Sequence, residues 1–138
     1  MSLNYGYRPW HPEGSDIRDS PVIKALDEAN GKEAEAILRD IELLCFHGLR
    51  RFGPGEEADA PPIDLRSLSD TDDLWEVRIR TPGRSFRLLV WVDNLCREVL
   101  LLVLYAKKSR RLPLQIKRLA EKRRRDWMKR HKHGLRLV

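Results

Sequence analysis

Hydrophobic positions in the first third of the chain recur with the 3.6-residue period of an α-helix. In "SPVIKALDEAN" (residues 20–30), Ser20 is suited to cap a helix and Pro21 fits its first position. The next stretch, "GKEAEAILRDIELLCFHG" (residues 31–48), carries an apolar stripe along one helical face. The stripe consists of Ala34, Ile37, Leu38, Ile41, Leu44 and Cys45. The pattern therefore predicts a helical hairpin that breaks where the two stretches meet.

From residue 74 onward the hydrophobic positions alternate with a period of two, which is typical of β-strands. "LWEVRIR" (residues 74–80) and "FRLLVWVD" (residues 86–93) are joined by "TPGR" (residues 81–84), whose Pro-Gly pair predicts a type II turn. "NLC" (residues 94–96) makes a second tight connection, to "REVLLLVLYA" (residues 97–106). The last strand is apolar on both faces, so we expect it to be central and covered by helices. The region therefore predicts a three-strand antiparallel meander.

Two flanking segments complete the predicted architecture. "YGYRPWH" (residues 5–11) suggests a short N-terminal edge strand, although Pro9 disfavours a strand assignment. Leu114 to about Lys129 predicts a basic helix with a narrow apolar side. The order of elements predicts an α+β fold, in which an N-terminal helical hairpin packs on a small antiparallel sheet and a basic helix follows.

Length and composition favour one soluble domain. The chain has 138 residues, of which 41% are hydrophobic and 35% charged. We expect a single domain over residues 1–138, with a core at roughly 18–130 and a flexible tail at 131–138. The sequence shows neither a membrane span nor a signal peptide. Cys45 and Cys96 lack Cys-x-x-Cys spacing, which favours free thiols in a cytoplasmic protein without a metal or another cofactor.

The charge is divided unevenly along the chain. Residues 1–69 contain 8 Lys or Arg and 13 Asp or Glu, a net charge of −5. Residues 70–138 contain 19 Lys or Arg and 8 Asp or Glu, a net charge of +11. The strongly basic second half of the chain favours RNA or DNA as a partner over a membrane, because no apolar amphipathic face accompanies the charge. The alternative is a surface that only keeps the protein soluble.

Cations recur on the predicted strands. Arg78 and Arg80 share one face of their strand, Arg87 lies on the next strand, and Lys107 and Lys108 end the last one. Exposed charges are ordinary on a one-sided sheet, but these are nearly all basic, with one carboxylate beside them. Guanidinium groups match phosphate oxygens, so the set suits a nucleic-acid backbone.

Such a patch has the chemistry for RNA cleavage. The 2′-hydroxyl must lose a proton, the phosphorane must be stabilised, and the 5′-oxygen must leave. Crowded cations lower the pKa of a lysine, which enables it to transfer protons near neutral pH. Arginines stabilise the charge that develops on the phosphorane, and no metal ion is required.

Several stretches resemble the phage-derived, HigB-like branch of the RelE toxin superfamily. They are "DLWEVRI", "SFRLLVWVD" and "EVLLLVLYAKKSRRLPLQIKRLAEKRRRDW", and "SPVIKALDEA" resembles the opening helix of that branch. The resemblance spans roughly residues 18–130. It implies a RelE-like fold and the toxin of a type II toxin–antitoxin system. Such toxins cleave mRNA, commonly on the ribosome, and are neutralised by a cognate antitoxin that often has a helix-turn-helix domain.

The resemblance also implies roles for individual residues. Arg78 and Arg87 fall on arginines assigned to the phosphate and the transition state. Lys107 and Lys108 fall on paired lysines, of which one is expected to transfer protons, because consecutive strand residues point to opposite faces. Further basic residues are expected to bind RNA without a metal ion, namely Arg80, Arg84, Arg110, Arg111, Lys117 and Arg118.

The chain departs from the pattern of that branch in three places. Tyr105 stands where phenylalanine is usual, Leu112 replaces a threonine suited to cap a helix, and residues 50–64 form a longer, acidic connection. Two alternatives therefore stay open. One is a non-catalytic module that binds RNA or the ribosome, and the other is a toxin of the same fold that inhibits a protein such as gyrase.

Overall fold

The computed structural model describes residues 5–47, 63–68, 74–93 and 95–137, with side chains as far as residue 131. It contains one five-stranded sheet in the order β1-β5-β4-β3-β2. The strands are β1 (Gly6–Pro9), β2 (Asp64–Ser67), β3 (Leu74–Arg80), β4 (Ser85–Asp93) and β5 (Glu98–Ala106). All neighbouring pairs are antiparallel except β1 and β5.

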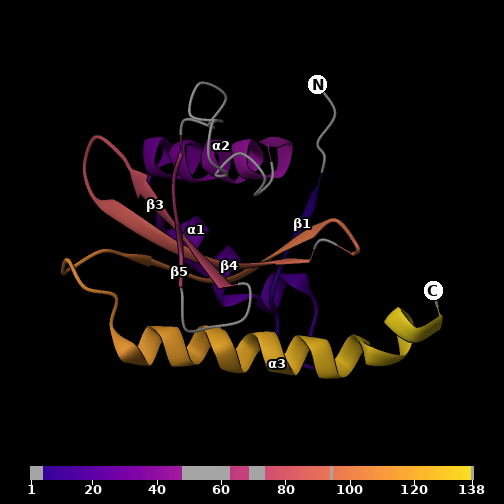
Figure 1. Ribbon diagram of the computed structural model, residues 1–138. Helices are drawn as coiled ribbons and strands as arrows, with labels where there is room; N and C mark the ends of the chain where they lie inside the picture. Colours follow the sequence, from indigo (N-terminus) through magenta and orange to yellow (C-terminus); the bar gives the residue numbers. More distant parts are fainter. Residues whose placement is uncertain (1–4, 48–62, 69–73, 94, 138) are drawn as a thin grey trace.

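Helices cover both faces of this sheet (Figure 1). On one face lie α1 (Pro21–Glu28) and α2 (Gly31–His47), which follow the short 3-10 helix η1 (Ile17–Asp19). On the other face lies α3 (Leu114–Leu137), a single long helix that runs along the sheet. The predicted α+β class, with a helical hairpin before the strands and a basic helix after them, is confirmed.

Local capping explains the two N-terminal helices. The Ser20 hydroxyl accepts hydrogen bonds from the amides of Val22 and Ile23, and Pro21 occupies the first turn, as predicted. The second helix begins with a reciprocal pair: the Glu33 amide donates to Asn30 Oδ1 at 2.9 Å, and the Asn30 amide donates to Glu33 Oε1 at 3.0 Å. The C-cap of α1 is Ala29, directly before Asn30, so the hairpin breaks at two adjacent caps.

Strand β5 is central, as its apolar sequence predicts. It lies between β4 and β1, and the edge strand β1 ends at Pro9, where the missing amide hydrogen does least harm. The other edge, β2, was not predicted from the sequence, because its first residue falls within the stretch assigned to the connection at 50–64. Much of that connection, residues 48–62, lies outside the described part of the chain.

The sheet has a hydrophobic cluster on each face, and a β-bulge lets β5 contribute side chains to both. Leu89 pairs with Val103 and Val90 pairs with Leu101, so Leu102 is an extra residue on β5. As a result, Leu102 and Val103 both pack under α3, while Leu101 faces α1 and α2. This switch explains why the strand must be apolar along nearly its whole length.

Two local predictions are wrong. A type II turn requires a positive φ at Gly83, but among the described glycines only Gly14 has one. Instead, the Thr81 hydroxyl donates to the carbonyl of Arg84 and accepts from the Gly83 amide at 3.2 Å. In addition, α3 extends to Leu137 rather than ending near Lys129. No helix in the described part of the chain has the length and apolar character needed to cross a membrane.

Candidate active site

Two rows of side chains meet at one end of the sheet, on the face that α3 covers. In the first row, Arg78, Arg87 and Tyr105 lie directly opposite one another on β3, β4 and β5. In the second row, Arg80 lies opposite Ser85. Because residues two apart on a strand share a face, both rows point to the same side.

The backbone places Lys107 in the second row. Its amide donates to the Ser85 carbonyl at 2.7 Å, which continues the β4–β5 ladder by one residue beyond the pairing of Phe86 with Ala106. If the alternation of strand side chains is continued through this hydrogen bond, it predicts that Lys107 shares the side of Tyr105 and that Lys108 points the opposite way. Across three strands, Arg80 and Lys107 are roughly 10 Å apart at their Cα atoms. We call this set the sheet-end patch; its members are Arg78, Arg80, Arg87, Tyr105 and Lys107.

Arg87 is the buried centre of the patch. Its side chain is 1% exposed, and one terminal nitrogen donates to the carbonyls of Ser109, at 3.0 Å, and of Arg110. The other terminal nitrogen lies 3.4 Å from the Tyr105 hydroxyl. The family resemblance implies that Arg87 stabilises the phosphate and the transition state, but its guanidinium has almost no exposed surface with which to contact a ligand. In this structure Arg87 ties β4 to the segment that follows β5.

Glu76 holds two arginines of the patch. It is 2% exposed, and its Oε1 accepts a hydrogen bond from Arg78 Nε at 2.8 Å. Its Oε2 lies 3.5 Å from Arg87 Nε, a distance typical of an ion pair rather than a hydrogen bond. The Arg78 side chain is still 29% exposed. Glu76 therefore fixes Arg78 at its inner nitrogen, and the outer end of that guanidinium is the part available to a ligand.

The segment after β5 adds exposed cations beside the patch. Lys107, Lys108, Arg110 and Arg111 are all exposed. The backbone of this segment is the one that Arg87 binds, at two successive carbonyls. The buried arginine is therefore in a position to fix where these exposed side chains begin.

Arg84 lies apart from the patch. Its guanidinium donates to both carboxylate oxygens of Glu33, at 3.0 and 2.9 Å, and stacks over Phe86 at 5.1 Å. The Arg84 guanidinium, together with the Asn30 amide, lowers the pKa of Glu33 to about 2. This pair ties the β3–β4 turn to the start of α2, so Arg84 has a structural partner already. Lys117 is half-buried and Arg118 is exposed; both lie on α3 rather than on the sheet.

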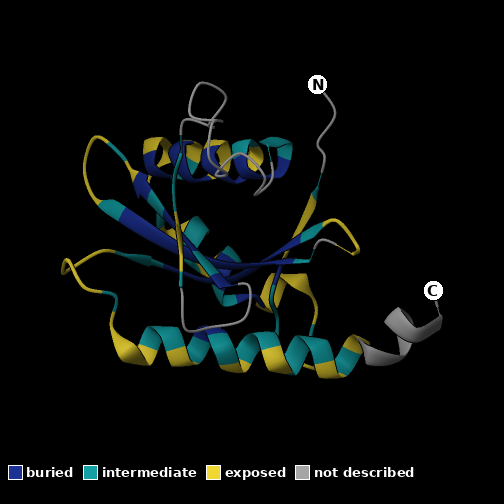
Figure 2. Ribbon diagram, in the orientation of Figure 1, coloured by how far each residue is buried: buried dark blue, intermediate teal, exposed yellow. Residues whose placement is uncertain are grey.

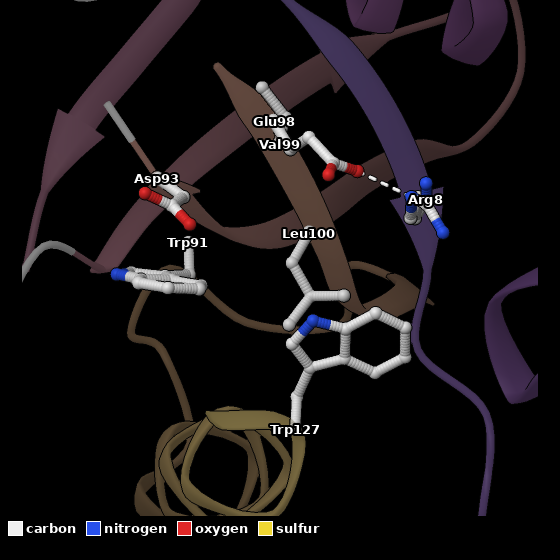
Figure 3. A pocket seen from close by; sticks show the side chains of 7 residues that line it. All are labelled: Arg8, Trp91, Asp93, Glu98, Val99, Leu100 and Trp127. Atoms are coloured by element: carbon white, nitrogen blue, oxygen red, sulfur yellow. Dashed lines mark hydrogen bonds and ion pairs between the residues drawn. The ribbon is translucent and has the colours of Figure 1, made fainter. Parts of the chain in front are cut away.

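The opposite end of the same face has a different chemistry (Figure 3). A small recess of about 30 Å³ is lined mainly by Trp91, Trp127 and two carboxylates. Glu98 is paired with Arg8, and Asp93 Oδ1 accepts amide hydrogen bonds within the β4–β5 turn. The recess has room for about one water molecule. Its carboxylates disfavour a phosphate, so the cationic end remains the candidate site.

The described part of the chain offers little for cysteine or metal chemistry. Cys45 is buried, and this burial raises the pKa of its thiol to about 12, which disfavours the nucleophilic thiolate. Among the described residues, no cluster of three or more His, Cys, Asp or Glu side chains is arranged to hold a metal ion. The sheet-end patch itself offers arginines, a lysine and a tyrosine.

Sequence reasoning missed the functions of two residues in or under the patch. Glu76 was noticed only as a lone carboxylate, and Tyr105, a departure from the family pattern, was weighed as a proton donor and interpreted as a core or rim aromatic. The signal for Glu76 was its spacing: it lies two residues before Arg78, and β-pairing brings Arg87 beside both. That signal could be used only once the register of the hairpin was known.

Comparison with known proteins gave one match. Residues 23–125 match a family model described as "Phage derived protein Gp49-like (DUF891)". The matched region begins in α1 and ends in α3, so it includes the whole sheet-end patch. No curated protein and no solved structure matched the chain.

Proposed function

Since the chain belongs to the Gp49-like family of phage-derived proteins, we propose that it is the toxin of a type II toxin–antitoxin system. Proteins of this RelE-like family are often toxins of such systems. In our proposal the protein is a HigB-like mRNA endoribonuclease that acts in the cytoplasm on ribosome-bound mRNA. A cognate antitoxin, with a helix-turn-helix domain, neutralises it.

One observation carries the nuclease proposal: cations from separate strands share one face at one end of the sheet. Arg78 and Arg80 come from β3, and Lys107 follows β5. Lys108 and the exposed arginines of the next segment lie beside them. An RNA phosphate at this place meets several donors at once, which is the arrangement that stabilises a developing phosphorane charge.

The proposed roles follow exposure. Arg78, held at Nε by Glu76, presents its outer nitrogens to the scissile phosphate. Lys107 shares its side of the sheet and is the proton-transfer residue, while Lys108 contributes to binding. Arg87 is a positioning residue, because it contacts the backbone of the lysine-bearing segment rather than open solvent. None of these steps requires a metal ion.

The test is expression in bacteria without an antitoxin. We expect the wild type to arrest growth and to create new 5′-hydroxyl ends on mRNA, and Arg78→Ala/Lys107→Ala/Lys108→Ala to do neither. Loss of one phosphate-stabilising donor alone should lower the cleavage rate about 10²- to 10³-fold. The matched control is Lys24→Ala/Lys32→Ala/Arg66→Ala, which removes three exposed cations elsewhere and should stay toxic. Equal growth of wild type and the patch variant would overturn the proposal.

A second candidate, a non-catalytic RNA- or ribosome-binding module, is favoured by the burial of Arg87. The most deeply placed cation of the patch is paired with Glu76 and with carbonyl groups, so it is a support rather than a reactive group. This candidate predicts tight, salt-sensitive RNA binding without new 5′-hydroxyl ends. End mapping after a short induction separates the two functions.

A further inference from the structure

The outer side of α3 carries a straight row of exposed cations. We call it the α3 stripe; its members are Arg118, Lys122, Arg125 and Lys129, all exposed. Their spacings of four, three and four residues place them within an arc of about 60° on a helix with 3.6 residues per turn. The row is about 16 Å long at a rise of about 1.5 Å per residue. Figure 2 shows exposed positions recurring along the side of α3 that faces away from the sheet.

Other arginines of the same helix are turned toward the protein. Arg123 stacks over Trp10 at 4.7 Å and donates to the Leu102 carbonyl at 2.7 Å. Arg124 stacks over Trp91 at 5.5 Å. These contacts attach the helix to the rest of the protein and direct both guanidinium groups inward. The helix therefore separates its basic residues into an inner structural set and an outer set.

Two carboxylates of α3 flank the outer set, and one of them is already engaged by partners in the protein. Asp126 accepts one hydrogen bond from the Trp10 indole, at 3.0 Å, and is paired with Arg130 at 2.8 Å. Glu121, half-buried, is the remaining carboxylate of the described helix; it lies about 70° around the axis from the centre of the stripe, one turn from Arg118 and from Arg125. Neighbouring cations three or four residues apart are about 5–6 Å from one another at Cβ. A row of cations at this spacing is suited to bind a polymer with regularly spaced negative charges.

The surroundings of the stripe narrow the choice of polymer. A membrane is disfavoured, because the apolar side of α3 is packed on the sheet rather than free to insert. Unpaired bases are disfavoured, because the stripe contains no aromatic side chain on which they could stack. Reading the major groove of DNA is disfavoured too, because that requires the helix to enter the groove, and the sheet covers its opposite side.

The remaining candidate is a nucleic-acid duplex whose phosphate backbone is contacted from outside the grooves. In A-form RNA the major groove is too deep and narrow for a helix, and the phosphates bordering the shallow minor groove are accessible from outside. We infer that the α3 stripe binds the phosphate backbone of double-helical RNA, without regard to base sequence. The choice of RNA over DNA rests on the proposed function, since a toxin that acts on the ribosome encounters folded RNA. The stripe would anchor the protein while the sheet-end patch meets the mRNA.

The test measures binding of the purified protein to a short blunt RNA duplex at several salt concentrations. The stripe variant is Arg118→Gln/Lys122→Gln/Arg125→Gln/Lys129→Gln, since glutamine keeps helix propensity. We expect binding about 100-fold weaker at 50 mM salt, and a slope of log K against log salt that is shallower by about 3. The variant Arg118→Lys/Arg125→Lys should bind like the wild type, because backbone contacts need charge and not a guanidinium fork.

The charge-matched control removes four exposed cations from other surfaces: Lys24→Gln/Lys32→Gln/Arg66→Gln/Arg97→Gln. Circular dichroism checks that every variant is folded. Equal loss of affinity in the stripe and control variants would overturn the inference, because net charge alone would then explain binding. Tighter binding to a DNA duplex of the same sequence, or equal binding to polyglutamate of matched charge, would overturn the choice of RNA.

Failure of this inference can be told apart from failure of the nuclease proposal. The patch variant Arg78→Ala/Lys107→Ala/Lys108→Ala retains the stripe, so it should keep most of the duplex affinity while losing toxicity. If the wild type bound duplex RNA through the stripe but never arrested growth, the nuclease proposal would fall and the binding surface would stand.

Discussion

The two faces of the sheet are held to their helices by different chemistry. The face under α1 and α2 is closed by aliphatic side chains such as Ile37, Leu44 and Leu88, each at most 1% exposed. The face under α3 contains tryptophans, stacked arginines and the buried pair of Glu76 with Arg87. The comparison teaches that cations here have two functions. Many of them stabilise the fold, and a count of basic residues alone overstates the surface available to RNA.

Among the substitutions that test this difference between the two faces, Glu76→Ala is expected to lower the free energy of unfolding most. The substitution leaves the Arg87 guanidinium buried without its carboxylate, which should lower the free energy of unfolding by about 3–5 kcal/mol. Urea denaturation measures the loss. The control is Glu98→Ala, which breaks an exposed pair on the same face, with Arg8 63% exposed, and should change stability by about 0–1 kcal/mol. Similar losses for both variants would contradict a distinct role for the buried pair.

The aliphatic face is tested by Ile37→Ala in α2. Ile37 is 0% exposed, so truncation leaves a cavity and should lower the free energy of unfolding by about 2–5 kcal/mol. Its neighbour Leu38 is 36% exposed, and Leu38→Ala should have a much smaller effect. Duplex RNA binding by folded Ile37→Ala protein should equal that of the wild type. A specific loss of RNA affinity would show that the two faces are not independent.

A smaller effect is expected where the two arginine sets adjoin on α3. Arg124→Gln removes the stacking over Trp91 and should lower the free energy of unfolding by about 0.5–2 kcal/mol with little change in RNA affinity. Arg125→Gln, one residue later on the exposed stripe, should weaken RNA binding and leave the free energy of unfolding nearly unchanged. Thermal unfolding and RNA titration of both variants measure the two quantities. If the two substitutions gave the same pair of effects, the division of α3 into inner and outer arginines would be wrong.

The smallest effect concerns the edge of the aliphatic face, where the exposed Arg84 holds the buried Glu33. The pKa of Glu33 is about 2 in the folded protein, below the value of about 4.3 for an unfolded chain. A depressed carboxyl pKa contributes stability that is present above the unfolded value and lost as the pH falls from about 4.3 to about 2. Glu33→Gln and Arg84→Gln should both flatten the pH dependence of unfolding in that window. A steep dependence retained in either variant would contradict the assignment.

The sequence predicted correctly those elements whose formation depends on nearby residues, such as a helix cap or a continuous apolar stretch. Ser20 with Pro21 gave the start of α1, and the doubly apolar stretch at 97–106 gave a central strand. Strand β2 escaped because four residues of mixed polarity give a weak period, and its stability depends on pairing with β3. The type II turn failed because the Thr81 side chain satisfies the turn with its hydroxyl instead.

The site was predicted in its residue types more than in their roles. That Arg78, Arg87 and Lys107 share one end of the sheet agrees with the expectation that strand-borne cations converge. The burial of Arg87 could not be predicted, because its partners are the carbonyls of residues 22 and 23 positions away. The α3 stripe was also only partly foreseen, since Lys117 and Arg118 differ in exposure and only the packed helix shows which side is outward.

The parallel pairing of β1 with β5 has a consequence for when the protein becomes active. Gly6 lies opposite Glu98, so β1 finds its β-partner in β5, which is translated after the other four described strands. Contacts this distant along the sequence slow folding, because a long loop must close before they form. A nascent chain that has not yet exposed residue 106 cannot complete the sheet or bring Lys107 to it. If the proposed toxicity is correct, the chain is harmless throughout most of its own translation.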